Sequence, residues 1–520
     1  MQLKSKVLTV LLGLAVLAGG VSAQNDTIRV STRLVQINVV VRDKKGPVAG
    51  LKASDFTVLD NKKPQKIEVF SELDTRGEVK SVTLPGVRGV SNYLDFSGAA
   101  PSGATVILFD MLNTMEEDQN NATKQLVAYL KTIRKEDRIA LYILAQQLYI
   151  VQDFTGNPDR LVQIAEQIRA SEQAGTELRS PSQLVNMLRP PNFTIGSSSS
   201  IWVVVPMVYG MVDNSSINQA DATTQALVTI ARHLKGLPGR KNLVWLSAGF
   251  PFSPPTRARR AGDAKGAAAP ETPDNFSAQL QNASRALNDA NVALYPVDVR
   301  GLSAGYPDVM LRLADATGGE VAYHTNDLAG AVRNAVSEGE ISYMLGFYSI
   351  ADPADQTFHD LTVKVNRKDA EVRHRSGYYP GDTRILTDRE RQALIGELLS
   401  SPLNASQIGL SAVAEPDPSI SGNYRVTVTV NTRNLQFDLQ NNRRTTKLVL
   451  ATRLESSKDK TVKTVTIPIS IPDAQFQTAL TQGIPLRSTI AGKAGDRLRI
   501  VIQDQSTGFG GALWLPLNEQ

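Results

Sequence analysis

The sequence predicts an α/β domain that is inserted between β segments and is followed by an all-β domain. Residues 27–75 show the alternating apolar pattern of strands, residues 104–338 alternate apolar strands with amphipathic helices, and residues 406–520 are again rich in strands. Strands that alternate with helices of this length form a mostly parallel sheet covered by helices on both faces. The 520 residues are enough for about three to four domains of roughly 150 residues each.

The composition excludes several classes of protein. A hydrophobic fraction of 42% with 21% charged residues is typical of a folded chain. Lys and Arg number 56 against 51 Asp and Glu, and the resulting charge of +5 is too small to indicate a nucleic-acid partner. The lack of cysteine excludes disulfides, thiolate zinc sites and cysteine nucleophiles. The four histidines have no metal-ligand spacing, which argues against a histidine-based metallohydrolase.

Residues 1–23 have the features of a secretory signal peptide. Two lysines precede an apolar run at 7–18, and small residues at 21–23 predict cleavage before Gln24. The alternative is an uncleaved anchor, but the apolar run is shorter than the ~20 residues that span a bilayer. No later segment is long enough to span one. The sequence therefore predicts export to the periplasm, the cell surface or the exterior, without a transmembrane span after cleavage.

The first β segment begins with a long strand. Alternating apolar residues between 30 and 41 precede turn residues at 43–47. A second pair of strands is predicted at 56–59 and 67–70, joined by a polar turn. Residues 71–103 contain Gly, Pro and Ser without periodicity and predict a linker.

The α/β pattern begins at residue 104. Strands are predicted at 106–109, 139–144, 148–151, 243–246, 292–299 and around 321. Helices are predicted at 126–133, 161–168, 227–234, 276–287 and 328–335. The second and third strands are too close together for a crossover helix, so the third is expected to be an antiparallel edge strand. Two insertions, 171–220 and 251–275, interrupt the pattern, and the second carries a basic cluster.

Strands return after residue 340. Residues 341–380 contain three predicted strands, and we hypothesise that they pair with residues 27–75, so that the α/β domain at 104–338 lies between the two halves of one β domain. Residues 385–400 predict a helical connector. The alternating segments within 406–520 predict a β-sandwich.

Motifs of enzymes are scarce. The sequence has no phosphate-binding loop, no dinucleotide fingerprint, no nucleophile elbow and no calcium-binding loop. Ser247 follows a strand but lacks the flanking glycine of a nucleophile elbow. Asp110 is more informative, because it ends the first buried strand, and open α/β sheets bind ligands at the carboxyl ends of their strands. Its carboxylate and the Thr114 hydroxyl could offer oxygens to a divalent cation, or Asp110 could simply cap the following helix.

A series of short motifs runs in order through residues 30–380. They are LVQINVVVRD at 34–43, GL at 50–51, DF at 55–56, Val58, FD at 109–110, NT at 113–114, GRK at 239–241, LSAG at 246–249, YPVDVRGL at 295–302, ATGG at 316–319, NDL at 326–328 and GYY at 377–379. In this order the motifs resemble a von Willebrand factor type A domain, most closely the exported VWFA-related family described from acidobacteria. Residues 381–520 are covered only loosely.

The resemblance implies a Rossmann-like type A domain with a metal-ion-dependent adhesion site, at which a divalent cation binds an Asp-x-Ser-x-Ser motif, a threonine and a later aspartate. Asp110 and Thr114 match the first and third positions. Leu112 replaces the middle serine, and Ala248 stands where the late aspartate would be. Thr155 and Thr176 are both conceivable for the threonine, and Asn113 could supply a substitute oxygen.

The resemblance therefore implies a degenerate metal site at Asp110, Asn113 and Thr114, holding Mg, Mn or Ca weakly, or a metal-free contact surface. Affinity for these ions follows the number of charged ligands and the rigidity of the site. The same three residues, with the two insertions, are the predicted partner contacts.

The function predicted from the sequence is that of an exported, non-catalytic binding, adhesion or scaffold protein. Its partner would be a protein or a polymer of the cell envelope. A structural envelope component would differ only in the partner and in permanence. The alternative is an enzyme or an enzyme accessory subunit that acts on envelope material, which would require a cleft lined by several buried acids.

Overall fold

The computed structural model describes most of the chain between residues 33 and 517. The described ranges are 33–44, 46–74, 89–92, 104–133, 138–145, 148–155, 158–173, 216–235, 237, 240–251, 274–303, 307–349, 357–379, 387–401, 403–433, 435–455 and 462–517. The predicted signal peptide and nearly all of both insertions lie outside these ranges. No helix in the described ranges is long and apolar enough to cross a membrane.

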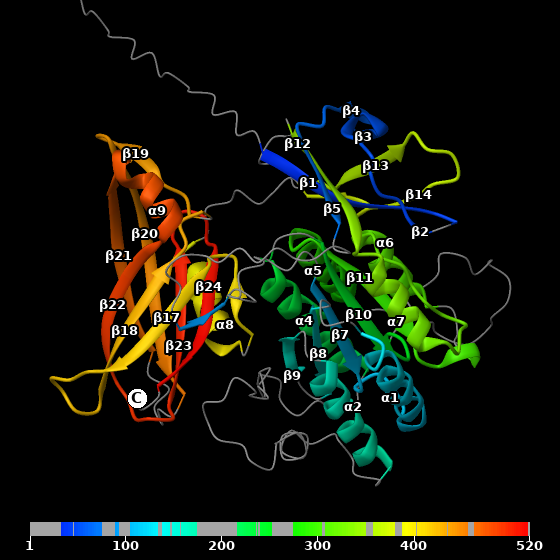
Figure 1. Ribbon diagram of the computed structural model, residues 1–520, viewed down its shortest axis with the longest axis horizontal. Helices are drawn as coiled ribbons and strands as arrows, with labels where there is room; N and C mark the ends of the chain where they lie inside the picture. Colours follow the sequence, from blue (N-terminus) through cyan, green and yellow to red (C-terminus); the bar gives the residue numbers. More distant parts are fainter. Residues whose placement is uncertain are drawn as a thin grey trace, which may run out of the picture.

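A five-stranded sheet forms the centre of the α/β unit (Figure 1). In spatial order it contains β11 (Val292–Asp298), β10 (Lys241–Ser247), β7 (Ala104–Asp110), β8 (Arg138–Leu144) and β9 (Leu148–Thr155). The first four strands are parallel, and β9 pairs antiparallel with β8 at the edge, as its proximity in the sequence predicts. Every residue of β7, β10 and β11 is buried, because helices cover both faces of the sheet.

Alternate strand residues supply two separate cores. Ile107 and Phe109 pack with α1 (Glu116–Leu130), α2 (Pro158–Gln173) and α7 (Leu328–Ser337). Val106 and Leu108 pack with α4 (Ser216–Leu234), α5 (Asp274–Asp289) and α6 (Asp308–Thr317).

Helix α6 is absent from the sequence prediction, and the strand expected around residue 321 is reduced to one parallel bridge between Val297 and Ala322. Gly318 caps the C-terminus of helix α6, and its φ of +75° and close approach to the His374 backbone exclude a side chain.

The N-terminal β unit consists of two sheets that share one core. The first contains β14 (Glu371–Arg373), β1 (Arg33–Asp43), β12 (Ile341–Ser349) and β5 (Val69–Asp74), with β2 (Gly46–Pro47) beside β1. The second contains β15 (Gly377–Tyr378), β13 (His359–Val365), β3 (Phe56–Asp60) and β4 (Lys63–Gln65), and η1 (Ala53–Asp55) precedes β3. Antiparallel pairing of β1 with β12 places Val35 opposite Phe347, so segments before and after the α/β unit lie in one sheet.

The predicted pairing of the strands at 56–59 and 67–70 is wrong. Strand β3 instead turns into β4 through Asn61 and Lys62, both with positive φ, while β5 pairs with β12. Two consecutive residues with positive φ make a tight two-residue hairpin, which leaves β5 free to join the other sheet.

The C-terminal β unit begins with α8 (Asp388–Ser400), whose first turn is closed by a reciprocal Thr387–Glu390 capping box. One sheet contains β16 (Ala405–Ser406), β24 (Gly510–Pro516), β23 (Arg497–Asp504), β20 (Arg443–Leu454), β19 (Asp438–Gln440) and β21 (Val462–Pro472). The other contains β22 (Ile484–Ala491), β18 (Asn423–Val430), β17 (Leu410–Pro416) and β6 (Val90–Ser91). The two share an apolar core, and η3 (Asp473–Gln475) and α9 (Phe476–Gln482) connect β21 to β22.

Part of the predicted linker at 71–103 is in fact a strand of this C-terminal unit. Strand β6 pairs with β17, and the buried Asn92 amide nitrogen donates to the Ala405 and Ile408 carbonyls at 2.6 and 2.8 Å. Asn92 Oδ1 accepts from the Leu410 N–H at 2.7 Å. A short polar segment without periodicity thus gains its structure from distant backbone groups, which local pattern cannot reveal.

Candidate functional site

Asp110 lies at the carboxyl end of β7 and is completely buried. Its carboxylate accepts four hydrogen bonds from the chain itself. The donors are the Asn113 backbone N–H at 3.1 Å, the Asn113 side-chain nitrogen at 2.8 Å, Trp245 Nε1 at 3.0 Å and Ser247 Oγ at 2.9 Å. Burial raises the pKa of Asp110 above its usual 3.8, and these hydrogen bonds oppose the shift.

Thr114 connects the ends of two neighbouring strands. Its hydroxyl donates to the Asp110 carbonyl at 2.5 Å and accepts from the Ala248 N–H, beyond β10, at 3.1 Å. Only 7% of Thr114 is exposed. The structure therefore places Asp110 and Thr114 next to each other. Their hydrogen bonds are made within the protein and connect the loops that follow β7 and β10.

Asn113 connects the loop after β7 to helix α4. Its side-chain nitrogen donates to Thr223 Oγ1 at 2.8 Å as well as to Asp110. The sequence prediction misses Thr223. The two threonines that it considers, Thr155 and Thr176, have side chains that are not among those described in the structure. Helix α4 begins at Ser216, well before the apolar face at 227–234 from which the sequence predicts it. If the helix predicted from residues 227–234 is extended by one turn toward the N-terminus, it includes Thr223, so helical periodicity could have revealed this residue.

The predicted metal ligands are hydrogen-bonded within the chain in this conformation, and a weakly held divalent cation stays a prediction. The Asp110 carboxylate accepts one hydrogen bond at Oδ1 and three at Oδ2, and Leu112 and Ala248 have no side-chain oxygen. A hard cation needs about six oxygen ligands, and no group of three or more His, Cys, Asp or Glu residues suited to a metal occurs among the described residues. The Asn113 amide joins Asp110 to Thr223 in the way that a shared cation would join two oxygen ligands.

The predicted partner contacts are mostly buried in this conformation. Asp110 and Thr114 are buried, so neither presents its side chain to a partner in this conformation, and Asn113 is only partly exposed. These three residues instead fix the shape of the loop between β7 and α1.

A second carboxylate at the same edge is absent from the sequence prediction of the site. Asp298 ends β11, is fully buried, and binds the guanidinium of Arg300 through Nε at 2.9 Å and Nη2 at 2.5 Å. Arg300 also lies near Asp118 in the first turn of α1, whose pKa is raised by burial and by Glu117 but lowered by Arg300. A carboxylate at a strand end with an arginine two residues later was the available signal.

Two large apolar side chains are exposed in the segments that follow β7 and β11. Met115, directly after Thr114, is 72% exposed, and Leu302 in η2 (Gly301–Ser303) is 69% exposed. The Leu302 N–H donates to Asn326 Oδ1 at 3.2 Å. We refer to Met115, Asp118, Arg300, Leu302 and Asn326 as the carboxyl-edge surface.

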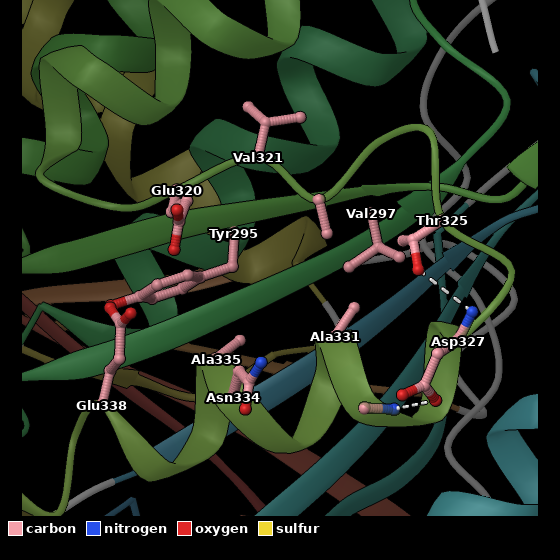
Figure 2. Close-up of a pocket in the computed structure, with 12 residues that line it drawn as sticks. Tyr295, Val297, Glu320, Val321, Thr325, Asp327, Ala331, Asn334, Ala335 and Glu338 are labelled. Atoms are coloured by element: carbon pink, nitrogen blue, oxygen red, sulfur yellow. Dashed lines mark hydrogen bonds between the residues drawn. The ribbon is translucent and has the colours of Figure 1, made fainter. Parts of the chain in front are cut away.

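A cavity of about 240 Å³ lies next to this surface, between β11 and α7 (Figure 2). Its acidic lining residues are Glu320, Asp327 and Glu338, and its walls contain the small residues Ala331 and Ala335. In Figure 2 the Tyr295 ring extends toward Glu338 at one end, while Asp327 and Thr325 lie at the other. The volume is below the ~300–1,000 Å³ of typical small-molecule pockets.

Each acid in this cavity has a structural partner. Glu338 is buried and accepts from Tyr295 OH at 2.8 Å, Arg373 Nη1 at 2.6 Å and Arg42 Nη1 at 3.3 Å. Asp327 caps α7 through the Gly330 N–H at 2.8 Å, and the exposed Glu320 pairs with Arg373. The cleft of several buried acids that the enzyme alternative requires is not formed here, because only Glu338 is buried.

No family model and no curated protein sequence matches the chain. Solved structures give low-scoring similarities. An aerotolerance-related membrane protein from Bacteroides fragilis is 11% identical, covering 45% of this chain and 98% of its own, with a TM-score of 0.27. BatB from Bacteroides thetaiotaomicron is 9% identical over 45% and 98%, with a TM-score of 0.26. Three N-terminal domains of the type V pili tip protein Mfa5 from Porphyromonas gingivalis are 9% identical over 88% and 78%, with a TM-score of 0.23.

Proposed function

We propose that this chain is an exported, non-catalytic binding or scaffold protein that contacts a protein or an envelope polymer through the carboxyl-edge surface. The observation that carries the proposal is that the exposed Met115 and Leu302 follow closely in sequence after Asp110 and Asp298, the buried and hydrogen-bonded ends of β7 and β11. Single exposed apolar residues are common on proteins, but here two follow the ends of strands at the ligand-binding edge of an α/β sheet.

The bonding of the two buried aspartates favours recognition over catalysis. A general acid or base must reach a substrate proton within hydrogen-bond distance. Asp110 uses its carboxylate on four internal donors, and Asp298 uses both oxygens on Arg300. Their role in this proposal is to hold the loops that carry Met115 and Leu302.

Rigid loops favour binding because less conformational freedom is lost when the partner docks. Acidic residues border this surface, since α1 begins with Glu116, Glu117 and Asp118, and Arg300 within the surface is paired with Asp298. The partner that fits has an apolar contact flanked by basic groups, and its attachment weakens as salt screens the charges.

The test is capture of envelope material by the full mature chain and two variants. The double variant Met115→Lys and Leu302→Lys should lose capture by at least about tenfold, because it places charge on both apolar contacts. The control Ile420→Lys alters a residue of similar exposure, 54%, in the C-terminal β unit and should capture normally. Capture that is unchanged in the double variant would refute the proposed surface, and turnover of envelope material by the wild-type chain would support the enzyme alternative instead.

A further inference from the structure

The cavity between β11 and α7 combines acidic ends with an apolar middle. Figure 2 shows Glu320 and Glu338 at one end, and Thr325 and Asp327 at the other. The walls between these ends are mostly apolar and consist of Val297, Val321, Ala322, Ala331 and Ala335. The volume of about 240 Å³ is below that of pockets that enclose whole small molecules, so one long side chain of a larger molecule is the better match.

The Glu338 end of this cavity has more negative than positive charge. The guanidinium of Arg373 lies 2.6 Å from Glu338 and also pairs with Glu320 and Glu371, while Arg42 lies 3.3 Å from Glu338. Three carboxylates thus share two guanidinium groups, and the described lining of the cavity contains no Lys, Arg or His. Burial lowers the pKa of Arg373, but these carboxylates raise it above its usual value, which is the effect of a negative potential.

The orientation of α7 adds to the negative potential at this end. Glu338 is the C-cap of α7, and the C-terminus of a helix has a partial negative charge that favours a nearby cation. At the other end of the cavity, Asp327 caps the N-terminus of the helix through the Gly330 N–H at 2.8 Å, so its negative charge is offset by the positive end of the helix dipole. A cation is therefore favoured at the Glu338 end.

The available acceptors favour a lysine over an arginine. The side chain of Glu320 is 57% exposed and, among the described residues, pairs with Arg373 through Oε2 alone. Asn334 also lines the cavity. Arginine presents a rigid fork that suits both oxygens of a carboxylate, whereas lysine is a compact charge with three rotatable donors. A lysine also buries its aliphatic stem along apolar surface while its ammonium reaches a polar group.

We propose that this cavity takes up one lysine side chain of a protein partner, with the ammonium beside Glu320 and the stem along the apolar walls. This inference rests on the proposed function, because the partner is the one that contacts the carboxyl-edge surface. Asn326 of that surface lies between Thr325 and Asp327 of the cavity in the sequence, so one partner can contact both. The cavity therefore narrows the partner to a protein with an accessible lysine.

The experiment uses Nα-acetyl-lysine methylamide as the probe and the corresponding norleucine compound, which keeps the stem but lacks the ammonium. NMR spectra of the full mature chain, isotope-labelled in its alanine methyl groups, report on Ala322, Ala331 and Ala335 in the cavity wall. The lysine probe should shift these methyl signals with a Kd of about 1 mM, since a ligand with so few buried atoms binds weakly. The norleucine compound should bind at least about tenfold more weakly, because it lacks the charged donor.

Glu320→Gln and Glu371→Gln form a matched pair of variants. Both side chains pair with Arg373 and are similarly exposed, 57% and 62%, but of the two only Glu320 lines the cavity. Glu320→Gln should weaken binding of the lysine probe at least about fivefold, and Glu371→Gln by less than about twofold. Equal effects of the two variants, or cavity methyl signals that the probe does not shift in the wild-type chain, would overturn the proposal.

The double variant Met115→Lys and Leu302→Lys separates this inference from the proposed function. It should bind the lysine probe as the wild type does, because neither residue lines the cavity. Capture of envelope material without probe binding would overturn the lysine site and leave the proposed function standing. Probe binding without capture would support the lysine site and refute the proposed surface. If the free diamine cadaverine bound at least about tenfold more tightly than the probe, the occupant would be a free amine and the proposal would be wrong.

Discussion

The side-chain nitrogen of Asn113 lies 2.8 Å from the Asp110 carboxylate and 2.8 Å from the Thr223 hydroxyl. One amide therefore ties the end of β7 to helix α4. This arrangement gives the buried Asp110 carboxylate a neutral donor, while Trp245 and Ser247 supply donors from β10. Hydrogen bonds of this kind hold a buried carboxylate without a metal ion, although they do not remove the full cost of burying its charge.

The first prediction concerns divalent cations. In the wild-type chain, magnesium, manganese or calcium should shift Tm by less than about 1 °C relative to chelator, because the Asp110 oxygens already have donors. The variant Asn113→Asp places a second carboxylate beside Asp110, so it should be less stable without cations and should regain stability when calcium or magnesium is added. Differential scanning fluorimetry measures both effects. If millimolar cation raised the Tm of the wild-type chain and Asp110→Ala abolished that increase, the result would contradict the prediction and support a metal site at Asp110.

The second prediction concerns pH. Because the pKa of Asp110 is raised in the folded chain, the folded state keeps this proton after the unfolded state has lost it. Its contribution to stability is full below the unfolded pKa and is lost as pH rises through the folded pKa. Asp110→Asn does not titrate at this position, so its stability relative to wild type should improve as pH rises above about 4, the ordinary pKa of aspartate in an unfolded chain. Urea unfolding at several pH values measures the difference, and a difference that is independent of pH would show that the hydrogen bonds cancel the effect of burial.

The third prediction compares two glutamates that share Arg373. Glu338 is buried and also binds Arg42 and Tyr295, whereas Glu320 has a side chain that is 57% exposed. Glu338→Gln should reduce the free energy of unfolding by about 2–3 kcal/mol, because it leaves buried donors without a charged partner. Glu320→Gln should change it by less than about 0.5 kcal/mol. Equal effects in denaturant titrations would mean that the burial of Glu338 is unimportant for the contact between the two units.

The fourth prediction concerns the attachment of helix α8 to the C-terminal sheet. Arg499 is fully buried, and its guanidinium donates to the Leu398 carbonyl at 2.8 and 3.0 Å and to the Leu403 carbonyl at 2.8 Å. Burial, with the nearby Arg453 and Arg497, lowers the pKa of Arg499 to about 9. Arg499→Met should cost about 3 kcal/mol, because these carbonyls lose their donors.

The matched control is Arg425→Met, which alters an exposed arginine of β18 and should have little effect. Denaturant unfolding followed by tryptophan fluorescence is suitable, since Trp514 lies beside Arg497 and Arg499. An Arg499→Met chain as stable as the control would show that solvent replaces the lost guanidinium.

Several elements of the fold could be predicted from local sequence. The apolar run before Asp110 predicted a buried strand, and the short interval before β9 predicted an antiparallel edge. These predictions succeed because side-chain periodicity and loop length depend on nearby residues. The missed helix α6 and the misassigned partner of β3 show the limit, since pairing between strands is decided by contacts that a local pattern does not contain.

The candidate site also divides into features that the sequence determines and features that depend on tertiary contacts. The sequence by itself determined that Asp110 ends a central strand, that Thr114 follows it, and that Leu112 and Ala248 lack the oxygens of a complete metal site. Only the tertiary structure decided that Asp110 is buried, that Thr223 shares the Asn113 amide, and that Arg42 binds Glu338 across 296 positions of sequence. The physical reason is that a hydrogen bond depends on the position of two groups in space. Distant donors and acceptors meet only when the sheet and its helices have packed.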